Sequence, residues 1–268
     1  MGWKGNESLR NQLLEVGYSI EETSTLLSYL EEDFPNASPE EAKSIAQRLL
    51  LHEPYAYIAG YQPFLNLKIG VSASVLIPRP ETEELVQLIL KSFVAPAPMQ
   101  VLDLGTGSGC IALALKSARP QWKVHALDAH EAALNVARKN AKSLQLPVDF
   151  YRFSMEDVDR WRGEEMHLMV SNPPYIPEEL SATLDVCVRE YEPASALFSP
   201  ANNPLYYYEW LLRWAALHLK SNGWLWVETD ANAHEKTRQL LVESATFKEV
   251  ESIVDFRGNP RFLKAQKK

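Results

Sequence analysis

The feature that most constrains the fold is an apolar segment that runs into a glycine-rich turn and then into a second apolar segment. Residues 100–104 are typical of a buried strand, and residues 110–115 predict a helix. Glycine lets the backbone approach a ligand closely, and the free N–H groups at a helix start favour polar or anionic groups. The turn contains Gly105, Gly107 and Gly109. A strand, a glycine turn and a helix in this order predict an α/β sheet that binds a ligand at this turn.

The glycine spacing disfavours a nicotinamide enzyme, because Cys110 stands where the dinucleotide pattern needs its third glycine. A second strand, predicted over residues 123–128, ends in Asp128 about twenty residues beyond the glycines. A carboxylate in that place accepts hydrogen bonds from ribose hydroxyls, although Asp128 taken alone is more often a solvated strand end. We therefore predict a nucleoside-bearing cofactor, bound by Asp128 together with Gly105, Thr106, Gly107, Ser108 and Gly109.

A further constraint comes from an apolar run, residues 167–170, that stops at Ser171-Asn172-Pro173-Pro174-Tyr175. Proline lacks the N–H that a sheet needs and holds the preceding residue extended. Asn172 is therefore predicted at the carboxyl end of a strand, where ligands of open α/β sheets bind. The Asn172 side-chain oxygen and the Pro173 carbonyl oxygen then point at one spot, and two acceptors at one spot suit an NH2 group. In isolation, Asn-Pro-Pro-Tyr is equally consistent with a plain turn.

The rest of the main domain, residues 81–268, alternates strands and helices. Further strands are predicted over residues 149–153 and 224–228, and helices over residues 132–141, 210–219 and 233–244, with a helix stop at 221–223. A last pair of strands is predicted over residues 250–256 and 261–264. This alternation predicts a doubly wound, mostly parallel sheet that ends in an antiparallel hairpin.

Before this domain the sequence predicts a helical module, residues 1–58, and a hairpin-like connector, residues 59–80. Three leucine-rich stripes recur at helical spacing in the module, and Ser38-Pro39 is a good helix start. The connector alternates over residues 63–71 and adds a short apolar run at 75–77, as expected for a hairpin or a pair of short strands. We predict that the module docks a substrate, while a plain structural cap fits its composition equally well.

Composition limits the partners and the compartment. The net charge of −8 and the pI near 5.4 disfavour direct nucleic-acid binding, because affinity for a phosphate backbone needs an excess of Lys and Arg. No apolar run approaches the roughly 18 residues of a membrane span, and the amino-terminal segment lacks a signal pattern. The two cysteines, Cys110 and Cys187, have neither disulfide-framework nor metal-site spacing. We expect a cytoplasmic chain with no membrane contact and no metal site.

Three motifs together resemble the HemK/PrmC family. In chain order they are Leu76-Ile77-Pro78-Arg79-Pro80-Glu81-Thr82-Glu83, Asp103-Leu104-Gly105-Thr106-Gly107-Ser108-Gly109 and Asn172-Pro173-Pro174-Tyr175-Ile176. The likeness extends to Tyr57-Ile58-Ala59-Gly60 and to Glu192, Pro193, Ala196 and Leu197. It implies a class I S-adenosylmethionine-dependent methyltransferase with a seven-stranded sheet, which releases S-adenosylhomocysteine. The implied substrate is the glutamine of the Gly-Gly-Gln loop in peptide chain release factors, methylated on its side-chain nitrogen N5.

The resemblance also implies roles for individual residues. Asn172, Pro173 and Tyr175 are expected to be catalytic, and with Pro174 they form the pocket for the glutamine amide. The Asn172 and Pro173 oxygens would each accept one amide hydrogen, which aims the nitrogen and stabilises the charge that develops on it. Tyr175 would pack against the amide plane and exclude water. The implied cofactor set adds Arg79, Glu81, Thr82 and Asn172 to the glycine turn and Asp128.

Three stretches depart from the family pattern. Ser154-Met155-Glu156-Asp157 replaces the usual residues near the adenine, and residues 199–204 and 228–230 also differ. Other functions remain open at this point. An adenine-N6 methyltransferase of DNA or RNA shares Asn-Pro-Pro-Tyr, and a ribosomal-protein glutamine methyltransferase would have the same pocket. A non-catalytic cofactor-binding protein is the third alternative.

Overall fold

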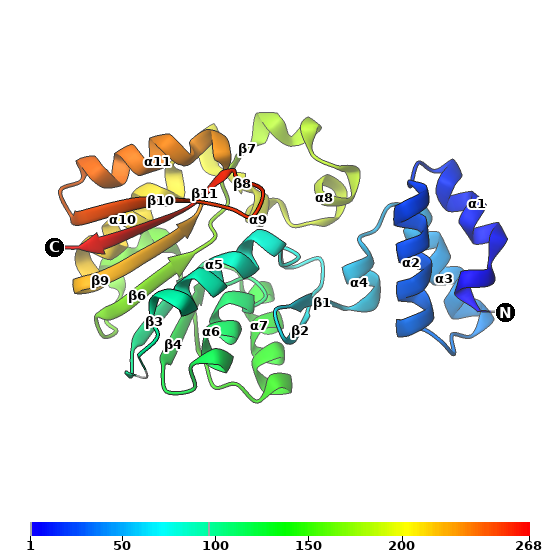
Figure 1. The fold of residues 1–268 in the computed structure, drawn as a ribbon, viewed down its shortest axis with the longest axis horizontal. Coiled ribbons are helices and arrows are strands. Elements are labelled where there is room, and N and C mark those ends of the chain that lie inside the picture. The colour runs from blue at the N-terminus through cyan, green and yellow to red at the C-terminus, as the bar shows by residue number, and fades with distance from the viewer. Residues whose placement is uncertain (1, 96) are drawn as a thin grey trace.

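The computed structural model describes residues 2–95 and 97–268 and places a group of amino-terminal helices beside a larger α/β domain (Figure 1). A short 3-10 helix, Trp3–Gly5, precedes these helices. They are α1 (Glu7–Glu15), α2 (Ile20–Asp33), α3 (Pro39–Leu50) and α4 (Tyr55–Ala59). The helices predicted within the amino-terminal module are therefore confirmed. The boundaries of the module and its docking role stay predictions.

Side-chain caps explain where these helices begin. Ser19 and Glu22 form a reciprocal capping box at the start of α2. Ser38 accepts a hydrogen bond from the Glu41 N–H at 3.2 Å, with Pro39 in the first turn of α3, which confirms the predicted helix start. The apolar faces of these helices bury one another in a cluster of their own, which contains Leu9, Leu13, Leu27, Leu30, Ile45 and Leu49.

The connector contains the predicted hairpin. Strands β1 (Tyr61–Phe64) and β2 (Leu67–Gly70) pair antiparallel. The strand predicted at residues 75–77 is wrong. Val75 closes a turn onto the Ser72 carbonyl, and the Ile77 N–H donates to the Glu192 carboxylate at 3.1 Å, so this backbone is satisfied without a partner strand.

The main domain is built on a seven-stranded sheet in the order β10-β11-β9-β6-β3-β4-β5. Its strands are β3 (Gln100–Leu104), β4 (Lys123–Asp128), β5 (Asp149–Arg152), β6 (Met166–Ser171), β9 (Leu219–Glu228), β10 (Phe247–Val254) and β11 (Pro260–Lys267). The neighbours from β9 to β5 run parallel, whereas β11 is antiparallel to both β9 and β10. The predicted doubly wound, mostly parallel sheet with an antiparallel end is confirmed.

Helices cover both faces of this sheet (Figure 1). One face carries α5 (Pro80–Ser92), α6 (Cys110–Ala118) and α7 (Glu131–Leu144), and the other carries α10 (Tyr206–His218) and α11 (Ala231–Glu243). Successive strand residues alternate between the two cores, because side chains of a strand point to opposite faces. Val101 lies in the cluster under α5 and α6, whereas Leu102 lies in the cluster under α10.

The structure moves one predicted boundary. Residues 221–223 were expected to stop a helix before a strand, but α10 already ends at His218 and β9 begins at Leu219. Met166 pairs with Leu219 and Leu168 with Trp224, so residues 220–223 form a bulge within β9. Asn222 takes a left-handed conformation there, with φ of 63°, which a strand tolerates only at such an irregularity.

A segment of short elements links β6 to α10, and the sequence predicts none of them. It contains β7 (Ile176–Pro177), α8 (Val186–Tyr191), α9 (Ala194–Leu197) and β8 (Phe198–Ser199), with 3-10 turns between them. The Tyr191 hydroxyl donates to the Leu51 carbonyl at 2.7 Å, which ties this segment to the amino-terminal helices. Across the described chain, no helix has the length and apolarity that crossing a membrane requires.

Candidate active site

The glycine turn between β3 and α6 is fixed to the end of β4. The N–H groups of Gly105 and Thr106 both donate to the Leu127 carbonyl, at 2.9 and 2.8 Å. Gly105 has φ of 76° and Gly109 has φ of 83°, conformations that residues with a Cβ rarely adopt. A Cβ at Gly109 would also come within 3.2 Å of the Ala137 Cβ on α7. Glycine is therefore needed here for the turn and for close packing of α6 against α7.

Asp128 lies at the end of β4 and faces the same turn. Its Oδ2 accepts a hydrogen bond from the Gly107 N–H and its Oδ1 accepts one from the His130 N–H, each at 2.9 Å. The residue is 9% exposed and lines a cavity. A carboxylate has about four lone-pair sites. After two backbone bonds, it can therefore still accept two hydrogen bonds from a ligand in the cavity.

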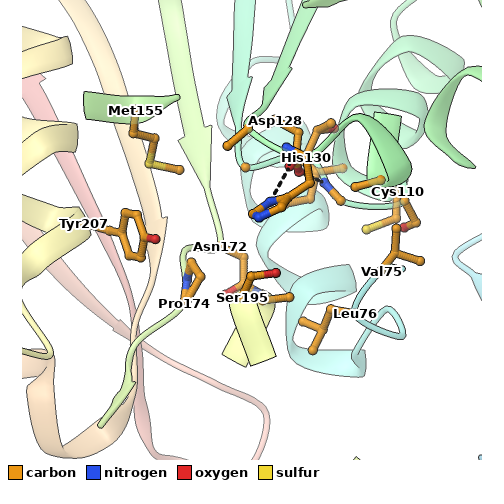
Figure 2. A pocket seen from close by; sticks show the side chains of 18 of the residues that line it. Val75, Leu76, Cys110, Asp128, His130, Met155, Asn172, Pro174, Ser195 and Tyr207 are labelled. Carbon is orange, nitrogen blue, oxygen red and sulfur yellow. Dashed lines mark hydrogen bonds and ion pairs between the residues drawn. The ribbon is translucent and has the colours of Figure 1, made fainter. Parts of the chain in front are cut away.

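The cavity measures about 300 Å³, the size of a small-molecule site. Figure 2 shows Met155, Pro174 and Tyr207 on one side of it and Cys110, Val75 and Leu76 on the other. Phe153 and Ile111 add to the apolar walls. The polar groups come from the glycine turn, Asp128, Asn172 and Thr82. Apolar walls with polar groups at a few points suit a ligand that combines a flat base with a polar chain.

Asn172 follows the last residue of β6 and lines this cavity. Its side-chain Nδ2 donates a hydrogen bond to Thr82 Oγ1 at 3.1 Å. Thr82 Oγ1 in turn donates to Glu228 Oε2 at 2.8 Å. No described residue donates to Asn172 Oδ1. The Asn172 side chain is thus held by its NH2 group, and its oxygen remains available to a ligand.

Most of the predicted site residues meet in this cavity. Those that line it are Thr82, Gly105, Thr106, Gly107, Ser108, Asp128, Asn172 and Pro174. The others, Gly109, Arg79, Glu81, Pro173 and Tyr175, lie outside the lining. Arg79 and Glu81 pair with Glu192 and Arg257, at 2.5 and 3.7 Å. Tyr175 packs against the apolar cluster under α10, and burial raises the pKa of its hydroxyl above the usual 10.

Some lining residues were not among the predicted site. Met155 and Glu156 follow β5, and Tyr207 lies in the first turn of α10. Glu156 accepts hydrogen bonds from the Ser154 and Tyr206 hydroxyls. The sequence had already indicated that the segment containing Met155 and Glu156 is unusual, because residues 154–157 depart from the family pattern, but it assigned these residues no role. The run of three tyrosines at 206–208 was a further signal, because the expected helix began only at 210.

Two buried polar atoms beside the turn lack a partner among the described residues, namely Ser108 Oγ and Asp103 Oδ1. Ser108 lines the cavity, but its Oγ is buried. Asp103 is fully buried, and its Oδ2 accepts from the Thr106 hydroxyl at 2.6 Å. Burial raises the pKa of the Asp103 carboxyl to about 7. The Asp128 carboxylate and the glycine turn together fit a cofactor that carries a ribose and further polar groups.

Comparisons with known proteins agree with this geometry. The family model of the methyltransferase small domain matches residues 82–197. A solved methyltransferase from Pyrococcus furiosus is 16% identical, covers 86% of this chain and 99% of its own, and has a TM-score of 0.57. The 16S rRNA methyltransferase RsmC of Thermus thermophilus is 18% identical over 78% of this chain and 50% of its own, with a TM-score of 0.55. The fold and the site define a class I methyltransferase that depends on S-adenosylmethionine.

Curated relatives narrow the class to one family. The release factor glutamine methyltransferase of Enterococcus faecalis is 37% identical over 240 residues, which are 90% of this chain and 85% of that protein. The protein of the same name from Bacteroides thetaiotaomicron is 38% identical over 85% of this chain and 81% of its own. The chain belongs to the release factor glutamine methyltransferase family. The resemblance expected from the three motifs is thereby confirmed.

Proposed function

We propose that the protein transfers a methyl group from S-adenosylmethionine to the side-chain nitrogen N5 of the glutamine in the Gly-Gly-Gln loop of peptide chain release factors. One observation carries this proposal beyond family membership. The Asn172 side chain lines the cavity and is held through its Nδ2, whereas its Oδ1 has no partner in the described chain. A free acceptor in that place suits the NH2 group of a glutamine side chain.

The chemistry explains why such an acceptor is needed. An amide nitrogen is a poor nucleophile, because its lone pair is delocalised into the carbonyl group. When bound, S-adenosylmethionine supplies a methyl group on a sulfonium, and the C–S bond pair returns to sulfur as the new N–C bond forms. Asn172 Oδ1 and the Pro173 carbonyl each accept one hydrogen of the glutamine NH2, which fixes the nitrogen in line and stabilises its developing positive charge. One of the amide protons then leaves to water, so no strong base is required.

Other residues hold the cofactor in this proposal. The Asp128 carboxylate accepts the ribose hydroxyls with the lone pairs that Gly107 and His130 leave free. The glycine turn would let the backbone approach the cofactor chain, and Met155 and Phe153, which line the cavity, would pack against the adenine. Arg79 and Glu81 do not line the cavity and are held in ion pairs. In this proposal they support the cofactor site indirectly and do not contact the cofactor. Tyr175 supports the amide pocket from behind.

The substrate is a protein, and its docking surface includes the helical module of residues 1–58. The release factor glutamine methyltransferase of Staphylococcus aureus is 30% identical over 97% of this chain, so its similarity includes most of this module. Direct nucleic-acid binding is not part of the proposal, in line with the net charge of −8. With a release factor as its substrate, we expect the protein to act in the cytoplasm.

The test is mass spectrometry of a purified release factor from the same organism after incubation with the protein and S-adenosylmethionine. We expect a gain of one methyl group on the glutamine of the Gly-Gly-Gln peptide. The Asn172→Ala variant should still bind S-adenosylhomocysteine but lose turnover by about a hundredfold or more, as for removal of one preorganised polar group. Methyl incorporation into a ribosomal protein or a nucleic acid, without any into the release factor, would replace the assigned substrate. Near-normal turnover of Asn172→Ala would overturn the assigned mechanism.

A further inference from the structure

A chain of two hydrogen bonds leads from the cavity to a buried carboxylate. Asn172 Nδ2 donates to Thr82 Oγ1 at 3.1 Å, and Thr82 Oγ1 donates to Glu228 Oε2 at 2.8 Å. The three residues come from three elements that meet at one edge of the sheet: the end of β6, the first turn of α5 and the end of β9. Thr82 is 3% exposed and Glu228 is 2% exposed. Water therefore does not compete for these bonds.

The number of protons on each group fixes the donor and the acceptor in both of these hydrogen bonds. A hydroxyl has one proton, and a carboxylate can only accept. The Thr82 proton must therefore lie on the Glu228 side, which leaves only an acceptor lone pair facing Asn172. Of the two ends of the Asn172 amide, only the NH2 can satisfy that lone pair. The oxygen end is then forced toward the cavity.

We propose that Thr82 and Glu228 are positioning residues that fix which end of the Asn172 amide faces the substrate. This inference rests on the proposed function, in which Asn172 Oδ1 accepts a hydrogen of the substrate amide. Without the two residues, the Asn172 side-chain amide can rotate by about 180° and present its own NH2 group to the substrate NH2 group. Two donors then face each other, and the nitrogen is no longer aimed at the methyl group.

The surroundings of Glu228 keep this device in place. The Tyr208 hydroxyl donates to the Glu228 backbone carbonyl at 2.9 Å, and Phe262 of β11 pairs with Glu228 in the sheet. The ionisable groups that interact electrostatically with the Glu228 carboxyl are Arg79 just before α5, Glu81 of α5, Cys110 of α6, Tyr175 after β6, Tyr208 of α10 and Arg261 of β11. Burial raises the Glu228 pKa to about 7.

Protonation of Glu228 removes the constraint. A neutral carboxyl group can donate to Thr82, which then donates to Asn172 and favours the reversed amide. The device therefore works above pH 7 and weakens as the pH falls below it. We expect turnover of the wild type to rise with pH through this region.

The first experiment compares Thr82→Val with Thr82→Ser in steady-state methylation of a release factor. Valine keeps the shape of threonine but has no hydroxyl, whereas serine keeps the hydroxyl. We expect Thr82→Val to lower kcat by about 10- to 100-fold, the usual cost of losing an orienting partner. Thr82→Ser should recover to within about threefold of the wild type, and affinity for S-adenosylhomocysteine by calorimetry should stay within about twofold in both. Thr237→Val is the matched control, because Thr237 is equally buried but lies on α11 and donates to the Ala233 carbonyl.

Two further comparisons separate a positioning role from a structural one. In an Asn172→Ala background, Thr82→Val should cost less than about twofold, because residues that act through one another are not additive. Glu228→Gln should lower kcat by about tenfold and flatten the rise near pH 7, since glutamine can either donate to Thr82 or accept from it and does not titrate.

The outcomes distinguish this inference from the proposed function. Loss of turnover in Asn172→Ala with full turnover in Thr82→Val and an unchanged pH profile in Glu228→Gln overturns the inference and leaves the proposed function standing. Near-normal turnover in Asn172→Ala overturns both. If Thr82→Val fails to bind S-adenosylhomocysteine and is therefore misfolded, the pH profile of Glu228→Gln decides. A profile like that of the wild type refutes the inference.

Discussion

The Arg79 guanidinium lies 2.5 Å from the Glu192 carboxylate, although 113 residues separate the two in the chain. The same carboxylate accepts the Ile77 N–H through its other oxygen. The Glu192 side chain is 1% exposed, and that of Arg79 is 31% exposed. This pair fastens the segment before α5 to the segment after α8, and these two segments supply Leu76 and Ser195 to the cavity.

We expect Arg79→Met to destabilise the protein by about 3 kcal/mol, because the buried Glu192 carboxylate would lose its charged partner. The measurement is the free energy of unfolding from urea denaturation. The double variant Arg79→Met with Glu192→Gln should recover much of the loss, since no uncompensated charge remains buried and the glutamine oxygen can still accept the Ile77 N–H. Arg213→Met, which breaks an exposed pair with Asp159, should cost less than about 1 kcal/mol. Equal losses for Arg79→Met and Arg213→Met would show that burial of this pair has no energetic role.

Asp128→Ala should weaken binding of S-adenosylhomocysteine by about 10- to 100-fold in calorimetry. Each hydrogen bond to a charged group is worth about 1.5–3 kcal/mol, and about 1.4 kcal/mol corresponds to a factor of ten. The loss has two sources, because Asp128 also holds the Gly107 N–H in the turn. Asp159→Ala, an exposed carboxylate away from the cavity, is the control and should bind normally. Unchanged affinity in Asp128→Ala would remove this residue from the cofactor site.

Gly109→Ala should lower the free energy of unfolding by about 1–3 kcal/mol. Its φ of 83° disfavours alanine, and the new methyl group would lie 3.2 Å from both the Ala137 Cβ and a Leu113 methyl carbon. Gly5→Ala is a suitable comparison, since nothing lies within 4 Å of a Cβ there and its φ is not positive. That variant should stay within about 0.5 kcal/mol of the wild type. If the two variants unfold alike, neither the backbone conformation nor the contact at Gly109 costs free energy.

The buried Asp103 predicts how stability depends on pH. Burial raises its pKa from the usual 3.8 to about 7, so the folded protein holds this proton more tightly than the unfolded chain. Stability contributed by Asp103 is therefore lost as the pH rises from about 4 to about 7. We expect Asp103→Asn to gain stability relative to the wild type between pH 5 and pH 8, by on the order of 2 kcal/mol. The check is urea denaturation at both pH values, with Asp159→Asn as control, and parallel curves would contradict the prediction.

Much of the fold could be predicted because its signals are local. Apolar runs gave the central strands, and Ser38-Pro39 gave a helix start that its cap confirms. The places of Asp128 and Asn172 at strand ends followed from the same runs, since parallel strands bring their carboxyl ends to one edge. The family motifs then placed Thr82 near them, and the structure puts all three residues on one cavity.

The parts that could not be predicted depend on distant partners. The run at residues 75–77 looks like a strand, but the Ile77 N–H is satisfied by a carboxylate 115 residues away. The bulge at 220–223 exists because β9 pairs with β6 on both sides of it. Tyr207 and Met155 line the cavity because of how α10 and the turn after β5 pack. No periodicity in the sequence indicates that packing.

The position of β9 also sets when the site becomes complete during synthesis. Glu228 meets Thr82 across 146 residues, and the Phe256 N–H donates to the Glu84 carboxylate across 172. Domains fold as units while the chain emerges from its amino terminus, and contacts between distant segments form late. A nascent chain that already contains Asn172 and the glycine turn still lacks the group that orients the Asn172 amide. The enzyme therefore acquires its ordered acceptor only as its final strands leave the ribosome, the machine whose release factors it modifies in the function we propose.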